Sequence, residues 1–184
     1  TWRDYMVSMG FGYKLGIDLP GEKRGMIPNA QFYDKAYRGS WNGLTVISIA
    51  IGQGEVTATP LQIANLGATI ANRGYFVTPH VVKEIEGETM DSVFSEKRYT
   101  KVDKSHYDEV AQGMRMAVLG GTCRTANMPD IEICGKTGTA QNHGKDHSAF
   151  MGFAPLNNPK IAVAVYVENG GWGATYGVPI GKLI

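Results

Sequence analysis

The sequence has almost no net charge, no long apolar run and little cysteine. Its 184 residues carry a formal net charge of +1 at pH 7, which gives no electrostatic basis for binding nucleic acid or an anionic membrane surface. No segment reaches the roughly 18 apolar residues of a membrane span, and the N-terminus lacks a targeting pattern. If the protein is membrane-anchored, the anchor is expected upstream of Thr1. The length predicts one domain.

The cysteine and histidine residues do not form a recognisable ligand pattern. Cys123 and Cys134 are the only thiols, and a disulfide between them fits an oxidising compartment, but their spacing does not require one. His143 and His147 flank Asp146 in a segment, 142–147, that is typical of a polar connection between two strands. The sequence therefore predicts no metal site and implies no cofactor.

Glycine clusters are present, but none has the spacing of a nucleotide-binding loop. A phosphate-binding loop ending at Gly135-Lys136-Thr137 needs a glycine five positions before Gly135, where Asp130 stands. The glycine pairs at 52 and 54 and at 171 and 173 lack the third glycine of a dinucleotide fingerprint. Nucleotide binding is unsupported.

The most informative stretch is Lys136-Thr137-Gly138-Thr139-Ala140, which follows an apolar run that alternates with the period of a strand. Alternation places the hydroxyls of Thr137 and Thr139 on one face, where they can share one carboxylate. Gly138, without a Cβ, allows a ligand backbone to pair with the strand edge. Lys136 adds positive potential. Thr-Gly-Thr is also compatible with a turn at the end of a strand that binds nothing. These residues alone do not distinguish a binding strand from such a turn, so other segments of the chain are needed.

Periodicity and turn residues predict a chain that mixes helices and strands. Helices are expected over 2–9, from Thr59-Pro60 to a stop at Asn72-Arg73-Gly74, and over about 104–118, with Val110, Met114 and Val118 at helical spacing. Residues 10–28 are expected to be irregular, 77–85 extended, and 86–99 charged and exposed. Strands over 131–141, 148–154 and 161–168 form an antiparallel meander, and a helix begins near Pro179.

Several further segments carry a resemblance to a known family. They are Gly16-Ile17-Asp18-Leu19-Pro20-Gly21-Glu22, Ile51-Gly52-Gln53-Gly54, Thr57-Ala58-Thr59-Pro60-Leu61-Gln62, Gly152-Phe153-Ala154-Pro155 and Val167-Glu168-Asn169-Gly170-Gly171. Together with Lys136-Thr137-Gly138, the third signature of penicillin-binding proteins, this order of segments resembles the transpeptidase domain of class B penicillin-binding proteins over nearly the whole chain. Within that family the chain looks most like the elongation-type enzymes of rod-shaped bacteria.

The resemblance lacks two family signatures. The family's nucleophile is a serine followed three positions later by a lysine, and no serine of this chain has a lysine at that offset. Ser40-Trp41-Asn42 has the residue types of the second signature, Ser-x-Asn, but it follows the Gly-Ile-Asp-Leu segment, whereas in the family that signature precedes it. We interpret it as an ordinary loop. Residues 1–184 are thus expected to be a single partial domain, the C-terminal portion of a transpeptidase domain, which is inactive alone and prone to self-association.

The resemblance implies an α/β (α+β) fold, a five-stranded antiparallel sheet between helices, of which three strands lie here. It also implies acyl transfer on peptidoglycan stem peptides, with β-lactams binding at the same strand. Lys136, Thr137, Gly138 and Thr139 would bind substrate; Lys136 and the peptide N–H of Thr139, an oxyanion-hole donor, would also serve catalysis.

The implied location is the periplasmic face of the inner membrane, with a glycosyltransferase and other elongation-complex proteins as partners. A β-lactam receptor and a non-catalytic interaction module remain alternatives.

Overall fold

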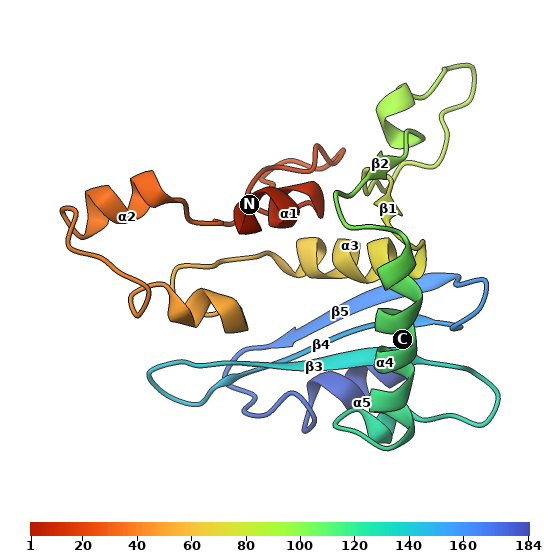
Figure 1. The fold of residues 1–184 in the computed structure, drawn as a ribbon. Helices are drawn as coiled ribbons and strands as arrows, with labels where there is room; N and C mark the ends of the chain where they lie inside the picture. The colour runs from red at the N-terminus through yellow and green to blue at the C-terminus, as the bar shows by residue number, and fades with distance from the viewer.

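The computed structural model describes residues 1–184 and is built around a three-stranded antiparallel sheet (Figure 1). The sheet has the order β3-β4-β5, which confirms the predicted meander. The elements in chain order are α1 (Trp2–Ser8), α2 (Ala30–Ala36), η1 (Ile47–Ile51), α3 (Pro60–Ala71), β1 (Tyr75–Phe76), η2 (Ser92–Phe94), β2 (Arg98–Tyr99), α4 (Ser105–Leu119), η3 (Arg124–Ala126), β3 (Cys134–Ala140), β4 (His147–Ala154), β5 (Ile161–Val167) and α5 (Gly177–Leu183).

Helices cover both faces of the sheet, and each face has its own core. Figure 1 shows α3 on one side, α5 on the other, and α4 crossing beside β3. One core packs Ile70, Tyr107 and Met114 against Cys134 and Phe153, and the other packs Val118, Cys123 and Val178 against Phe150. The N-terminal half of α4 therefore belongs to the α3 face and its C-terminal half to the α5 face, so α4 wraps around the start of β3.

The two thiols lie in these separate cores and are free. Both cysteines are fully buried. Burial raises the pKa of the Cys134 thiol to about 11 and raises the pKa of the Cys123 thiol as well. They lie on opposite faces of β3, which leaves no place for a disulfide between them in this fold.

The start of α3 has the expected capping chemistry. The Thr59 hydroxyl accepts from the Gln62 peptide N–H at 3.1 Å, while the Gln62 side chain accepts from the Thr59 peptide N–H at 3.0 Å. This reciprocal pair is a capping box, and Pro60 occupies the first turn. The helix ends before Arg73 and Gly74, both of which have positive φ, as the sequence predicted.

Gln62 also fixes the irregular segment 10–28 to α3. Its side chain is 1% exposed, and its Nε2 donates to the carbonyl oxygens of Gly10, Tyr13 and Arg24 at 3.0 to 3.2 Å. The Glu22 carboxylate accepts from three successive peptide N–H groups, of Leu15, Gly16 and Ile17. The Gly-Ile-Asp-Leu-Pro-Gly-Glu segment is therefore a loop closed by its own last residue.

The structure refines three sequence predictions. In α4 the buried positions are Tyr107, Ala111, Met114 and Val118, and Val110 is 46% exposed. The segment 77–85, expected to be extended, joins neither sheet, and the peptide N–H groups of Val81 and Val82 donate to the Asp18 carboxylate. Strand β3 begins at Cys134 rather than at Ile131, where the expected strand began.

The residue before β3 makes hydrogen bonds outside the sheet. The carbonyl oxygen of Ile133 accepts from Arg115 Nη1 at 3.0 Å, and its peptide N–H donates to Ile131 at 2.9 Å. Both backbone groups of Ile133 are thus engaged on the edge away from β4, and pairing with β4 begins at Cys134, opposite Phe153.

Candidate functional site

β3 is an edge strand, and only its first half is flanked by a helix. The order β3-β4-β5 gives β3 a strand neighbour on one side only. On the other side, Arg115 of α4 reaches Ile133, and the turn after α4 reaches Thr137. The rest of this edge, from Thr137 to Ala140, has no neighbouring strand. Three of the four predicted site residues, Thr137 to Thr139, therefore lie where a chain edge is open to a ligand backbone, and Lys136 directly precedes them.

Lys136 places a cation at this open edge. Its side chain is exposed, and Nζ donates to the carbonyl oxygen of Thr137 at 2.7 Å. The two salt bridges of the structure join Asp4 to the N-terminus and Arg73 to Asp108. Lys136 thus has no acidic partner in this chain, and its charge is available to an anion.

The hydroxyls of Thr137 and Thr139 lie on the same face of β3, as alternation predicted, but each contacts a different loop. Thr137 Oγ1 lies 2.9 Å from Thr122 Oγ1, in the turn after α4. Thr139 Oγ1 accepts from the Gly173 peptide N–H at 3.3 Å, in the segment after β5. Sequence reasoning missed both neighbours: Gly120-Gly121 indicates only that a helix ends, and Gly173 carries no chemical signal.

The opposite face of β3 borders a cavity of about 570 Å³. Residues 138–140 line it from β3, Ala149 from β4 and residues 164–166 from β5, and the facing wall comes from the segment 51–58 and the start of α3. Gly138 faces Ala149 of β4, whose Cβ would lie 3.3 Å from a Cβ placed on residue 138. The C-terminal half of β3 therefore separates the open edge from a mostly apolar hollow.

An anchor outside the cavity holds the segment 51–58. The two oxygens of the Glu55 carboxylate accept from the hydroxyls of Tyr33 at 2.8 Å and Tyr37 at 2.9 Å, both on α2. The Tyr33 hydrogen bond is the main cause that lowers the pKa of Glu55. Burial, followed by the Glu55 contact, raises the pKa of Tyr33 to about 12. The glycine motif at 52–54 is thus held in place by α2.

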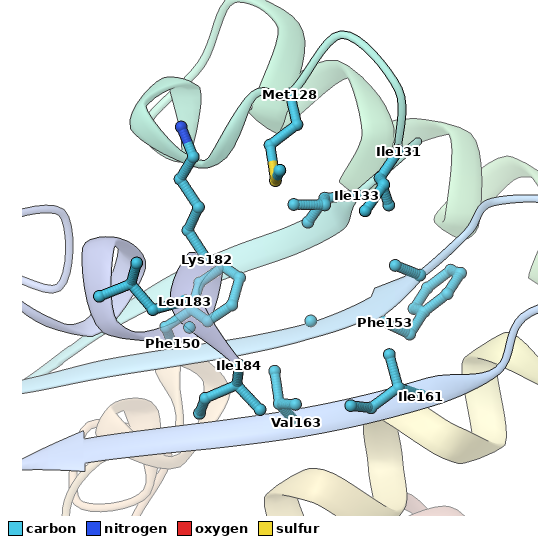
Figure 2. Close-up of a pocket in the computed structure, with 13 residues that line it drawn as sticks. Met128, Ile131, Ile133, Phe150, Phe153, Ile161, Val163, Lys182, Leu183 and Ile184 are labelled. Carbon is cyan, nitrogen blue, oxygen red and sulfur yellow. The ribbon is translucent and has the colours of Figure 1, made fainter.

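A second, smaller cavity of about 200 Å³ lies at the other end of the sheet. Figure 2 shows it enclosed by apolar side chains such as Ile133, Phe153, Ile161 and Leu183, with the ammonium of Lys182 directed away. That ammonium donates to the carbonyl oxygen of Asn127. None of the predicted site residues lines this cavity.

The other sequence candidates have structural roles. Ser40-Trp41-Asn42 lies in the loop between α2 and η1, where Trp41 Nε1 donates to Asp34 at 2.7 Å. His147 Nδ1 accepts from the Asn169 peptide N–H, and its ring packs on Tyr166 with centroids 5.3 Å apart. No group of three His, Cys, Asp or Glu side chains is arranged to hold a metal ion. The helices are all too short or too polar to cross a bilayer.

Comparison with known proteins identifies the family. The family described as penicillin binding protein transpeptidase domain matches residues 1–184. The chain is 38% identical to the peptidoglycan D,D-transpeptidase MrdA of Acinetobacter baumannii over 93% of its own length and 28% of that protein. The curated MrdA relatives are about three times longer, since the chain spans 28% to 32% of those from A. baumannii, Haemophilus influenzae and Escherichia coli K12.

Solved structures give the same result. The crystal structure of Pseudomonas aeruginosa PBP2 in complex with WCK 5153 superposes with a TM-score of 0.84 at 39% identity, covering 96% of this chain and 39% of that one. PBP2 in its complex with MreC from Helicobacter pylori superposes with a TM-score of 0.81 at 29% identity, covering 96% of this chain and 33% of that one. The fold class expected from the resemblance, a penicillin-binding transpeptidase fold, is confirmed.

The chain belongs to the penicillin-binding protein transpeptidase domain family. Within that family it is of the PBP2 or MrdA type of class B penicillin-binding protein, the class that the sequence motifs indicated.

Proposed function

We propose that this chain forms the substrate-binding strand, and the scaffold behind it, of a peptidoglycan D,D-transpeptidase. The observation that carries the proposal is the open half of β3, where an unpaired ammonium and two hydroxyls occupy one strand edge. The relatives named peptidoglycan D,D-transpeptidase support the reaction class. Residues 1–184 are, in this proposal, the C-terminal part of one transpeptidase domain.

The proposed reaction is acyl transfer through a serine that lies outside these 184 residues. The serine oxygen attacks the carbonyl carbon before the terminal D-alanine of a stem peptide, the C–N bond breaks, and the leaving amine takes a proton. The amine of a second stem peptide then attacks the acyl-enzyme, forms the cross-link and releases the serine. A β-lactam follows the first step only, because its opened ring stays attached.

The residues of β3 supply binding and charge stabilisation. The hydroxyls of Thr137 and Thr139, with the ammonium of Lys136, bind the terminal carboxylate. The Thr139 peptide N–H donates to the oxyanion that develops on the attacked carbonyl; loss of one such donor typically costs about 2.7 to 4 kcal/mol of transition-state stabilisation. Gly138 leaves room for the substrate backbone.

The backbone directions of β3 support this pairing. The Thr137 carbonyl oxygen accepts from the Lys136 side chain at 2.7 Å, as expected if this carbonyl points to the open edge rather than to β4. In an antiparallel strand both backbone groups of one residue point to the same side, and this side recurs every second residue. The N–H and C=O of Thr139 then point to the open edge too, ready to pair with an added strand.

We further propose that the whole protein acts on the periplasmic face of the inner membrane, held by an N-terminal anchor, together with a glycosyltransferase and other proteins of the elongation complex. The solved complex of PBP2 with MreC from Helicobacter pylori supports a partner of this kind.

The test is covalent labelling with a fluorescent penicillin. It compares this chain with the extended protein, which we define as the same chain preceded by a segment that carries Ser-x-x-Lys. Label on the extended protein alone is the expected result. Label on neither would overturn the transpeptidase function in favour of an interaction module. Label on the 184-residue chain would show that the nucleophile is one of its own residues.

A further inference from the structure

The turn after α4 is held tightly against β3. The peptide N–H groups of Gly121 and Cys123 both donate to the carbonyl oxygen of Ala117, at 3.1 and 3.0 Å. A Cβ on residue 121 would lie 2.8 Å from the Ala117 Cα, so only glycine fits there without a shift. Cys123 is fully buried in the core on the α5 face. Thr122, between two fixed neighbours, is therefore held beside β3 even though its own side chain is exposed.

Thr122 contacts the site through one hydroxyl pair. Its Oγ1 lies 2.9 Å from Thr137 Oγ1, and either oxygen can be the donor. Each hydroxyl has a single proton to donate and two lone pairs to accept with. If Thr137 donates to Thr122, its proton is used inside the chain. If Thr122 donates to Thr137, the proton of Thr137 is free for a ligand.

The hydroxyl of Thr139 also has a hydrogen-bond partner within the chain, and here the direction of the hydrogen bond is fixed. Thr139 Oγ1 accepts from the peptide N–H of Gly173, which can only donate. The proton of Thr139 is therefore free to donate outward. A carboxylate bound at β3 accepts hydrogen bonds and offers none, so it selects the same direction at Thr137 and leaves Thr122 as the donor behind it.

We propose that Thr122 is a positioning residue for carboxylate recognition: it donates to Thr137 Oγ1, so that Thr137, like Thr139, turns its proton toward the ligand carboxylate. This inference rests on the proposed function of β3 and adds a residue outside that strand. Hydrogen bonds in a chain polarise one another, so the Thr122 hydroxyl also strengthens the bond that Thr137 makes. Thr122 itself does not touch the substrate.

The test measures the acylation rate of the extended protein by a penicillin and by the methyl ester of the same penicillin. Thr122→Val keeps the shape and removes the donor. It should lower the second-order acylation rate of the free acid by about 3- to 10-fold, the effect of one net hydrogen bond, and that of the ester by less than about 2-fold. Thr122→Ser, which keeps the hydroxyl, should stay close to the starting protein. Thermal unfolding of each variant reports whether it is folded.

A double-mutant cycle with Thr137→Val separates this inference from the proposed function. In the Thr137→Val background, Thr122→Val should have no further effect. An equal loss for acid and ester, an unchanged acid rate, or a persistent effect in the Thr137→Val background would overturn the role of Thr122. If Thr137→Val alone fails to reduce the acid rate selectively, carboxylate binding at Thr137 is wrong, and the inference falls with it.

Discussion

The peptide N–H of Gly173 donates to Thr139 Oγ1 at 3.3 Å and thereby ties the segment after β5 to the open half of β3. The same segment is fixed to β4 by Ser148, whose buried hydroxyl donates to the carbonyl of Trp172 at 2.9 Å and accepts from the peptide N–H of Gly177 at 3.0 Å. A Cβ on residue 173 would overlap backbone atoms of Gly138 and Ala149. The site strand is therefore supported from behind by a residue that has no room for a side chain.

Replacing Gly173 should therefore damage both stability and acylation. We expect Gly173→Ala to lower the free energy of unfolding by about 1 to 3 kcal/mol, as overpacking does, and to slow penicillin acylation of the extended protein at least tenfold. The matched control is Gly144→Ala, because residue 144 has open space for a Cβ and no positive φ. Urea unfolding and acylation kinetics measure the two effects. Equal behaviour of the two variants would contradict the support from Gly173.

Gln62 should be the most costly single polar residue to replace. Gln62→Leu keeps the volume but leaves three carbonyl oxygens and the Thr59 peptide N–H without their partner. We expect a loss of about 3 kcal/mol or more, since each buried unsatisfied group costs about 1 to 3 kcal/mol. The exposed Gln112, changed to leucine, should stay within about 0.5 kcal/mol. A Gln62→Leu protein of unchanged urea midpoint would show that the loop 10–28 does not depend on this side chain.

The contact of Tyr33 with Glu55 predicts two pH dependences of stability. Because the pKa of Tyr33 is raised to about 12 in the folded chain, its contribution is complete below the unfolded value of about 10 and is lost as the pH rises from 10 to 12. Because the pKa of Glu55 is lowered, its contribution is present above the ordinary carboxyl value of about 4.3 and is lost as the pH falls below it.

Tyr33→Phe removes the hydroxyl and keeps the ring, so it should flatten the stability profile at both extremes. The exposed phenol of Tyr99 provides the control, since Tyr99→Phe should leave both limbs in place. Urea unfolding at several pH values gives the profiles, and absorbance at alkaline pH follows phenol ionisation directly. A Tyr33→Phe profile that matches the starting chain would rule out the Tyr33–Glu55 contact as their origin.

The outer edge of β5 predicts self-association of the 184-residue chain. β5, Ile-Ala-Val-Ala-Val-Tyr-Val, carries no charge, lies at the sheet edge opposite β3, and borders both apolar cavities. Edges of this kind pair with other strands unless charges protect them. Light scattering should show oligomers that Tyr166→Lys shifts toward monomer, while Tyr99→Lys on β2 has no such effect. A monodisperse monomer with a sharp unfolding transition would contradict this prediction.

Local patterns predicted the parts of the structure that local chemistry controls. Thr59 and Pro60 mark the start of α3, and alternation places Thr137 and Thr139 on one face of β3. Helix α2 was not predicted, because its one buried side chain, Tyr33, depends on Glu55, 22 positions away. Val110 was identified by its helical spacing with Met114 and Val118 but is exposed, since the buried stripe of α4 includes Ala111 instead.

The strand that carries the candidate site was predicted, but the residues from other segments that contact it were not. The residues of β3 could be named as candidates because their types and spacing are informative, and their role in binding stays a prediction. Thr122 and Gly173 could not, because each reaches β3 through a turn whose path is set by distant packing. The reach of Gln62 to Gly10, 52 positions away, is equally invisible to periodicity.

The most direct test of carboxylate binding at the open half of β3 is a crystal structure of the extended protein acylated by a penicillin. We expect the penicillin carboxylate within about 3 Å of the hydroxyl oxygens of Thr137 and Thr139, with the Lys136 ammonium nearby and the acyl oxygen facing the Thr139 peptide N–H. A carboxylate bound away from β3, with these two hydroxyls still directed only at Thr122 and Gly173, would contradict it.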